Sequence, residues 1–124
     1  MPEFTRAEAA DAISYALTAF QTFRNTVPRE RARMLRRWYA VCEEHTEDLA
    51  KIVTWENGKP LAEATGEIKY GNSFFEWFSE EAPRIYGDVI PSSIKGNRIV
   101  TIRQPIGVVG IITPWNFPMG NILQ

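Results

Sequence analysis

The 124-residue sequence contains one cysteine and one histidine, so residues that bind metals or take part in redox chemistry are scarce. With Cys42 alone no intrachain disulfide can form, so nothing in the composition indicates an oxidising compartment. His45 has no nearby set of ligating side chains in the sequence, and we expect no metal site. Cys42 falls on the apolar stripe of an expected helix, which favours a small buried thiol over a nucleophile.

Long hydrophobic runs and a strong net charge are also missing. Every apolar run is far shorter than the ~20 residues that span a bilayer, and the formal net charge is −1. We therefore expect neither a membrane nor a nucleic-acid partner. Five arginines lie within residues 29–37, but neighbouring glutamates balance them, which favours a solvated helix face. The amino terminus lacks the features of a signal or transit peptide, so a cytoplasmic location is expected.

Helical periodicity dominates residues 5–86. Apolar residues recur at helical spacing from about residue 5 to 24, from Pro28 to about 45, and again after Thr46, the expected cap of a third helix. Asn57 and Gly58 are typical of a helix end. A fourth, longer helix is predicted after Pro60 by a stripe of seven residues: Leu61, Ala64, Ile68, Gly71, Phe75, Phe78 and Ala82. Gly71 lies on that stripe, where a missing side chain allows close packing.

Two strands are predicted after these helices. Residues 98–104 mix apolar and polar side chains, as in an exposed edge strand that needs a partner or protection. Residues 106–112 are uniformly apolar and rich in β-branched side chains, which predicts a strand buried on both faces of a parallel sheet. Pro114 ends this run, and residues 119–124 look like the first turn of another helix. The expected fold class is therefore α/β.

The loop at residues 113–118 is the candidate site, because ligands bind at the carboxyl ends of strands in open α/β sheets. Asn116 carries a neutral amide donor, and Pro114 and Pro118 restrict the backbone around it. Such a donor suits a developing oxyanion and can contribute about 3 kcal/mol. Trp115 offers a flat apolar wall. Spacing alone favours a plainer alternative, in which Asn116 bonds nearby backbone and Trp115 packs in the core.

Residues 112–118, with the sequence ITPWNFP, resemble a highly specific motif of the aldehyde dehydrogenase superfamily. The resemblance implies that Asn116 helps form the oxyanion hole for the thiohemiacetal made by a catalytic cysteine. It further implies NAD or NADP as the cofactor. The residues expected to line the cofactor cleft are Ile112, Thr113, Pro114, Trp115 and Asn116.

Two further segments carry the resemblance. Residues 56–64 are similar to a segment common to many aldehyde dehydrogenases, and residues 75–91 look specifically like the succinate-semialdehyde dehydrogenase branch. Pro83 departs from the basic residue expected there. The resemblance covers essentially the whole chain, but only the amino-terminal part of a longer polypeptide. It implies a truncated Rossmann-like cofactor-binding domain, with residues 98–104 as an oligomerisation-type strand.

The implied parent enzyme is a homo-oligomer that oxidises a small aldehyde, with succinate semialdehyde as the first expectation. The resemblance places its nucleophilic cysteine, its glutamate base and its cofactor-binding lysine beyond residue 124. Residues that distinguish NAD from NADP are expected downstream as well. Two alternatives stay open: a dehydrogenase for another short aldehyde, and a non-catalytic module that docks onto full-length subunits through an exposed strand edge.

We expect the purified 124-residue chain to form no NADH or NADPH from an aldehyde, because it lacks both nucleophile and base. The absorbance of the reduced nicotinamide, followed with succinate semialdehyde and either cofactor, measures this. A full-length aldehyde dehydrogenase serves as the positive control. Turnover by the chain alone would contradict the expectation.

Overall fold

The computed structural model describes residues 3–124, so the part of the amino-terminal expectation that concerns Met1 and Pro2 lies outside the described residues. The helices are α1 (Arg6–Phe23), α2 (Pro28–Glu44), α3 (Thr46–Asn57) and α4 (Leu61–Glu81), followed by the short 3-10 helix η1 (Ala82–Arg84). The strands β1 (Val89–Pro91) and β2 (Arg98–Val100) and the one-turn helix α5 (Gly120–Leu123) complete the order. These bounds agree with the helical segments predicted between residues 5 and 86.

Local sequence signals set most of the helix ends. Thr5 and Glu8 form a capping box at α1, in which the Glu8 backbone N–H donates to Thr5 Oγ1 at 3.3 Å. Gly58 ends α3 in the left-handed region, with a φ of 79°. Thr46 is not the cap that was predicted: it is the first residue of α3. Its hydroxyl instead donates to the Cys42 carbonyl of α2 at 3.0 Å, which closes the turn between the two helices.

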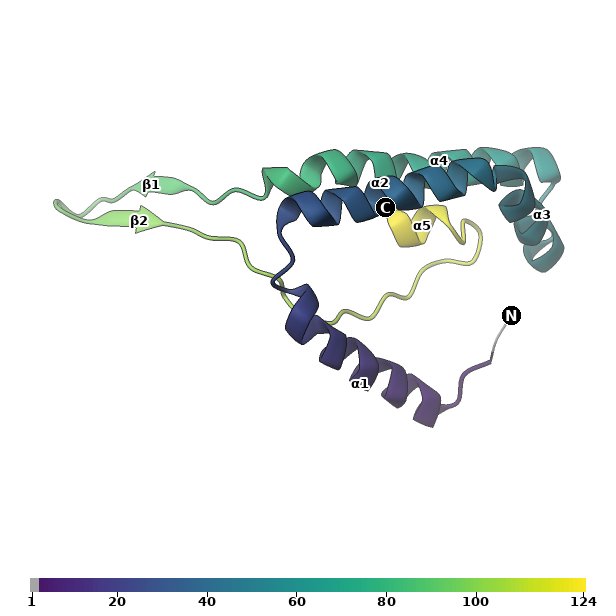
Figure 1. The fold of residues 1–124 in the computed structure, drawn as a ribbon, viewed down its shortest axis with the longest axis horizontal. Coiled ribbons are helices and arrows are strands. Elements are labelled where there is room, and N and C mark those ends of the chain that lie inside the picture. Colours follow the sequence, from purple (N-terminus) through teal and green to yellow (C-terminus); the bar gives the residue numbers. More distant parts are fainter. Residues whose placement is uncertain (1–2) are drawn as a thin grey trace.

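Helix α4 is the central element, and it packs against α2, α3 and α5 (Figure 1). The buried core is small and consists of Ala50 from α3 with Ala64 and Ile68 from α4. Between α2 and α4, the rings of Trp38 and Phe75 contact each other with centroids 5.4 Å apart. The alanines have little volume, so the helices approach closely and the core is narrow.

Gly71 is where α5 crosses α4. A Cβ atom at this buried position would lie 3.0 Å from Met119 Cγ and 3.4 Å from the Gly120 nitrogen, closer than most side-chain contacts. The close packing predicted at Gly71 is therefore confirmed. Gly120 in turn faces the ring of Tyr70, where a Cβ would meet Cδ1 at 3.4 Å. Helix α5, and with it the carboxyl end of the candidate loop, is fixed against α4.

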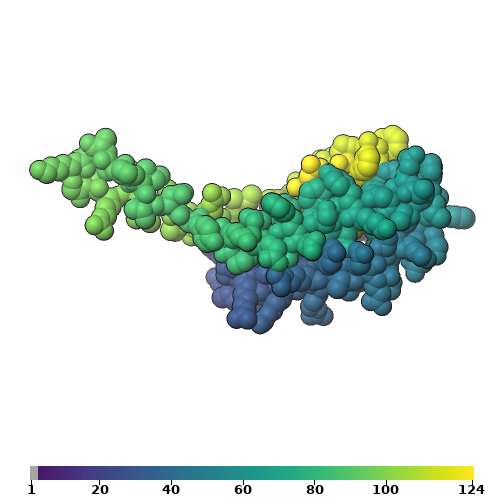
Figure 2. All heavy atoms as spheres, turned by 90° about the horizontal axis from the view of Figure 1, so that it is seen from above, coloured from purple at the N-terminus to yellow at the C-terminus, as the bar shows by residue number. Residues whose placement is uncertain are grey.

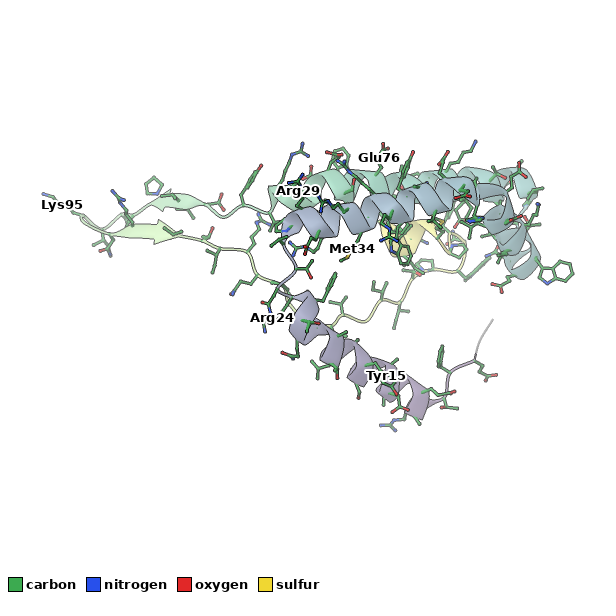
Figure 3. All side chains as sticks on the ribbon, in the orientation of Figure 1. Tyr15, Arg24, Arg29, Met34, Glu76 and Lys95 are labelled. Atoms are coloured by element: carbon green, nitrogen blue, oxygen red, sulfur yellow. The ribbon has the colours of Figure 1, made fainter. Side chains whose placement is uncertain are left out.

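Helix α1 packs against none of the other helices and strands of residues 3–124, and Figure 1 shows it apart from the bundle. Its side chains, such as Tyr15, stand free along the helix in Figure 3. Ile13 and Leu17 are 60% and 54% exposed. An apolar face this open is typical of a surface that further protein covers.

The strands differ from the prediction. The strand expected at residues 98–104 is shortened to β2, which pairs antiparallel with β1 so that Val89 lies opposite Val100. Residues 106–112 form no strand, and Ile106 and Ile112 are almost fully exposed. The prediction of a strand buried on both faces is wrong for this chain. A strand requires a hydrogen-bonded neighbour, and within residues 3–124 no segment pairs with residues 106–112.

The β1–β2 hairpin extends from the bundle as a narrow arm in Figures 1 and 2, with Lys95 at its tip in Figure 3. At its base the Thr101 backbone N–H donates to the Asp88 carbonyl at 2.8 Å. Gly87 is required there, because a Cβ would lie 1.9 Å from the Thr101 carbonyl oxygen. Upstream, α4 ends at Glu81 and Pro83 lies in η1, so the proline coincides with the end of the long helix.

The substitution Ile68→Ala is expected to lower the free energy of unfolding by about 2–5 kcal/mol, because it opens a cavity in a small core. Ile13→Ala is the matched control, since it removes the same atoms from an exposed position on a helix that packs against no other helix or strand of residues 3–124. Urea titration followed by far-ultraviolet circular dichroism measures both. Equal loss of stability in the two variants would show that the bundle core does not stabilise the helices.

Candidate functional site

The backbone of the Trp115–Asn116 loop is held by the junction between α3 and α4. Asn57, the last residue of α3, donates from Nδ2 to the Trp115 carbonyl oxygen at 2.8 Å. Lys59, in the connection to α4, donates from Nζ to the Asn116 carbonyl oxygen at 2.6 Å. Two consecutive carbonyl groups of the loop are thus fixed by side chains more than 50 residues earlier in the sequence.

A buried ion pair connects this junction to the far end of the loop. Lys59 Nζ lies 2.5 Å from Glu67 Oε2, and the two side chains are 10% and 0% exposed. The other oxygen of Glu67 accepts the Met119 backbone N–H at 2.9 Å and the Gly120 backbone N–H at 3.5 Å. Lys59 Nζ also lies 4.0 Å from the centroid of the Phe117 ring. The buried carboxylate therefore has a cation and two N–H donors, as buried charges require.

The start of the loop is also bound by a residue that follows it. Asn121 of α5 donates from Nδ2 to the Pro114 carbonyl oxygen at 3.3 Å. Three successive carbonyl oxygens, from Pro114 to Asn116, therefore accept hydrogen bonds from three different side chains. This arrangement fixes the main chain of the loop without using any side chain of Trp115 or Asn116.

The side chains of the predicted site face outward. Ile112 and Trp115 are 102% and 77% exposed, Pro114 and Asn116 are exposed, and Thr113 is half-buried. Within residues 3–124 the Asn116 amide makes no hydrogen bond, so its donor is available to a ligand. The alternative in which Asn116 bonds nearby backbone and Trp115 packs in the core does not describe this geometry.

A sequence profile described as "Aldehyde dehydrogenase family" matches residues 1–124. The chain belongs to the aldehyde dehydrogenase family. It is 53% identical over 124 residues to "Succinate-semialdehyde dehydrogenase [NADP(+)]" of Saccharomyces cerevisiae, covering all of this chain and 25% of that protein. It is 52% identical to "Glutarate-semialdehyde dehydrogenase" of Pseudomonas aeruginosa, covering all of this chain and 26% of the relative.

A solved structure agrees with the sequence comparisons. The crystal structure of an Escherichia coli NADP-dependent enzyme superposes with a TM-score of 0.92 at 49% identity, covering 99% of this chain and 26% of that chain. The fold is thus that of the amino-terminal part of an aldehyde dehydrogenase. The chain spans about a quarter of the length of the relatives it matches.

Within this aldehyde dehydrogenase segment, four of the five residues from 112 to 116 have exposed side chains. Trp115 offers an exposed ring face, Ile112 an exposed aliphatic side chain and Asn116 a free amide. These groups fit one face of a flat heteroaromatic ring such as nicotinamide. A cavity of about 680 Å³ lies elsewhere, between α2 and α3, and its lining includes Trp38 and Leu49. Residues 112–116 do not contribute to it.

Sequence reasoning missed Asn57, Lys59 and Glu67 as parts of this site. The sequence predicts Asn57 as a helix end, and both Asn57 and Lys59 lie in residues 56–64, which carry the family resemblance. Glu67 gave a usable signal, because it lies on the buried side of α4 between Ala64 and Gly71. A carboxylate at such a position needs a partner, which the sequence does not identify.

Cys42 in α2 and His45 directly after it are the only cysteine and histidine of the sequence. Burial raises the pKa of the half-buried Cys42 thiol, which disfavours the reactive thiolate. In the described part of the chain, no group of three or more His, Cys, Asp or Glu side chains is placed to hold a metal ion. No helix within residues 3–124 combines the length and apolar character needed to cross a bilayer.

Cys42 is expected to react with iodoacetamide more slowly than a free cysteine at neutral pH, because its raised pKa leaves less thiolate. The rate should rise with pH and approach its plateau at a higher pH than the free thiol does. Mass spectrometry of timed samples measures it, with the chain in concentrated urea as the control. A native rate equal to the urea rate throughout the pH range would contradict this expectation.

Proposed function

We propose that this chain is the amino-terminal part of an NAD(P)-dependent aldehyde dehydrogenase that oxidises succinate semialdehyde to the acid. The observation that carries this proposal is the free amide of Asn116 on a loop whose main chain is fixed. The relatives support the substrate, since the yeast protein is named for succinate semialdehyde and the P. aeruginosa protein for glutarate semialdehyde. Both aldehydes carry a carboxylate at the other end of a short chain.

Asn116 acts on the oxygen of the aldehyde. A cysteine thiolate from the polypeptide beyond residue 124 adds to the carbonyl carbon, a C–S bond forms, and the π electron pair moves onto oxygen. The Asn116 amide then donates a hydrogen bond to this alkoxide. Because an amide stays neutral, it stabilises the charge without transferring a proton, and its fixed backbone limits the reorganisation required.

Ile112, Thr113, Pro114 and Trp115 form the wall of the cofactor site in this proposal. When bound, NAD or NADP would supply the hydride acceptor for this oxidation. Trp115 contributes its ring face, and Pro114 restricts the backbone at the start of the loop. Together these residues orient the flat ring and keep water from one side of the reacting carbon.

Glutarate semialdehyde is the second candidate substrate, and the 52% identity to the P. aeruginosa relative favours it. It differs from succinate semialdehyde by one methylene group. A hydrophobic site discriminates one methylene by only about 1–3 kcal/mol, so both substrates are expected to turn over. The ratio of their kcat/KM values in a full-length protein ranks them.

The proposed enzyme is cytoplasmic and forms a homo-oligomer. The β1–β2 hairpin supports oligomer formation, because its short strands have free edges and Val89 and Val100 are 75% and 65% exposed. A non-catalytic docking module would use the same hairpin. Such a module gives no role to the Trp115–Asn116 loop, so catalysis is the better account.

Asn116→Ala is expected to lower kcat about 10²- to 10³-fold, which is the usual cost of losing one oxyanion donor. The test protein is a fusion in which this chain replaces the matching quarter of the yeast enzyme, hereafter the fusion enzyme. Asn25→Ala is the matched control, because Asn25 lies in the α1–α2 connection away from the site. Steady-state kinetics with succinate semialdehyde and NADP measure both, and an unchanged kcat in Asn116→Ala would refute the oxyanion role.

A further inference from the structure

We propose that Lys59 and Glu67 are positioning residues, which hold the backbone around Asn116 so that its amide points at the reacting oxygen. The inference rests on the oxyanion role proposed for Asn116. Neither side chain touches substrate in this proposal. Their contribution is to fix the direction of the Asn116 side chain from the α3–α4 junction.

Lys59 and Glu67 bind the main chain of the loop at two places, the Asn116 carbonyl and the Met119 N–H. Lys59 Nζ holds the Asn116 carbonyl oxygen at 2.6 Å and contacts the Phe117 ring. Glu67 holds the same Nζ at 2.5 Å and accepts the Met119 N–H at 2.9 Å. One carboxylate therefore connects the main chain at Asn116 to the start of α5.

Because peptide groups are planar, these contacts also fix the direction of the Asn116 side chain. The Cα of Asn116 joins two planar peptide groups. The first contains the Trp115 carbonyl, and the second contains the carbonyl of Asn116 itself. Asn57 holds the first carbonyl and Lys59 holds the second. With both planes held, the backbone dihedrals of Asn116 and the direction of its Cβ are set. Only the side-chain torsions remain to be fixed.

The burial of the pair points to positioning rather than to stability. Within residues 3–124, the salt bridges Arg36–Glu80, Lys51–Asp48 and Arg84–Glu81 join side chains that are all at least 42% exposed. The side chains of Lys59 and Glu67 are 10% and 0% exposed. A buried ion pair loses hydration and often stabilises a fold no better than apolar residues of the same size. Its advantage here is that Lys59 reaches a defined carbonyl oxygen.

The test separates positioning from folding in the fusion enzyme. Lys59→Met alone leaves the Glu67 carboxylate buried without its cation and is expected to lower the melting temperature. Lys59→Met/Glu67→Gln removes both charges, while the Gln oxygen still accepts the N–H groups of Met119 and Gly120. This double variant should melt within a few degrees of the parent. Its kcat should still be about 10- to 100-fold lower, with KM for succinate semialdehyde unchanged, because the misplaced donor acts only in the transition state.

Two further variants complete the design. Lys59→Arg keeps a cation with several donors and should retain kcat within about three-fold of the parent. The surface pair Lys51–Asp48 provides the matched control, and Lys51→Met/Asp48→Asn should change neither melting temperature nor kcat. A Lys59→Arg variant as slow as Lys59→Met/Glu67→Gln would overturn donation to the Asn116 carbonyl.

The most direct test combines the variants of the Lys59–Glu67 pair with Asn116→Ala and compares the kcat values. Added to Asn116→Ala, the Lys59→Met/Glu67→Gln change should lower kcat by no more than about two-fold, because the group it positions is already gone. A full additional loss in that background would overturn the inference. A normal kcat in Lys59→Met/Glu67→Gln, with a low kcat in Asn116→Ala, would overturn the positioning role alone. A normal kcat in Asn116→Ala would overturn the proposed function instead.

Discussion

The carboxylate of Glu67 is the constraint on which the arrangement of the site depends. It is fully buried, so it must find donors inside the protein, and it finds them in Lys59 and in the backbone at the start of α5. The backbone N–H groups of Met119 and Gly120 reach it because Gly71 lets α5 approach α4 closely. The small residue and the buried charge thus act together to place the loop.

The loop combines a fixed main chain with free side chains. Its carbonyl groups are used for attachment, by Asn57, Lys59 and Asn121, while the amide of Asn116 and the ring of Trp115 stay exposed. A catalytic hydrogen-bond donor needs this division, because a donor that must reorganise during reaction loses much of its effect. The surrounding helices therefore act as a support for residues that they do not cover.

Features that depend on single residues could be predicted from the sequence, whereas contacts between distant segments could not. Helix ends at Pro28 and Gly58, and the close packing at Gly71, follow from conformational preferences of single residues, and they were predicted. The strand at residues 106–112 was predicted wrongly because its apolar composition says nothing about whether a pairing partner is present. The Lys59–Glu67 pair and its contact with Asn116 were missed, since they join segments that only the folded helices bring together. The oxyanion role of Asn116 stays a prediction, made from its proline-restricted loop and from the family motif.

The uncovered segment at residues 106–112 has a consequence for biosynthesis. Relatives of this chain are about four times longer, so in a polypeptide of that length this segment leaves the ribosome well before most of the sequence exists. With Ile106 and Ile112 open to solvent and no neighbouring strand, it can associate with other nascent chains during that interval. Productive folding of such a protein therefore depends on sheltering these few residues until the remaining strands are synthesised.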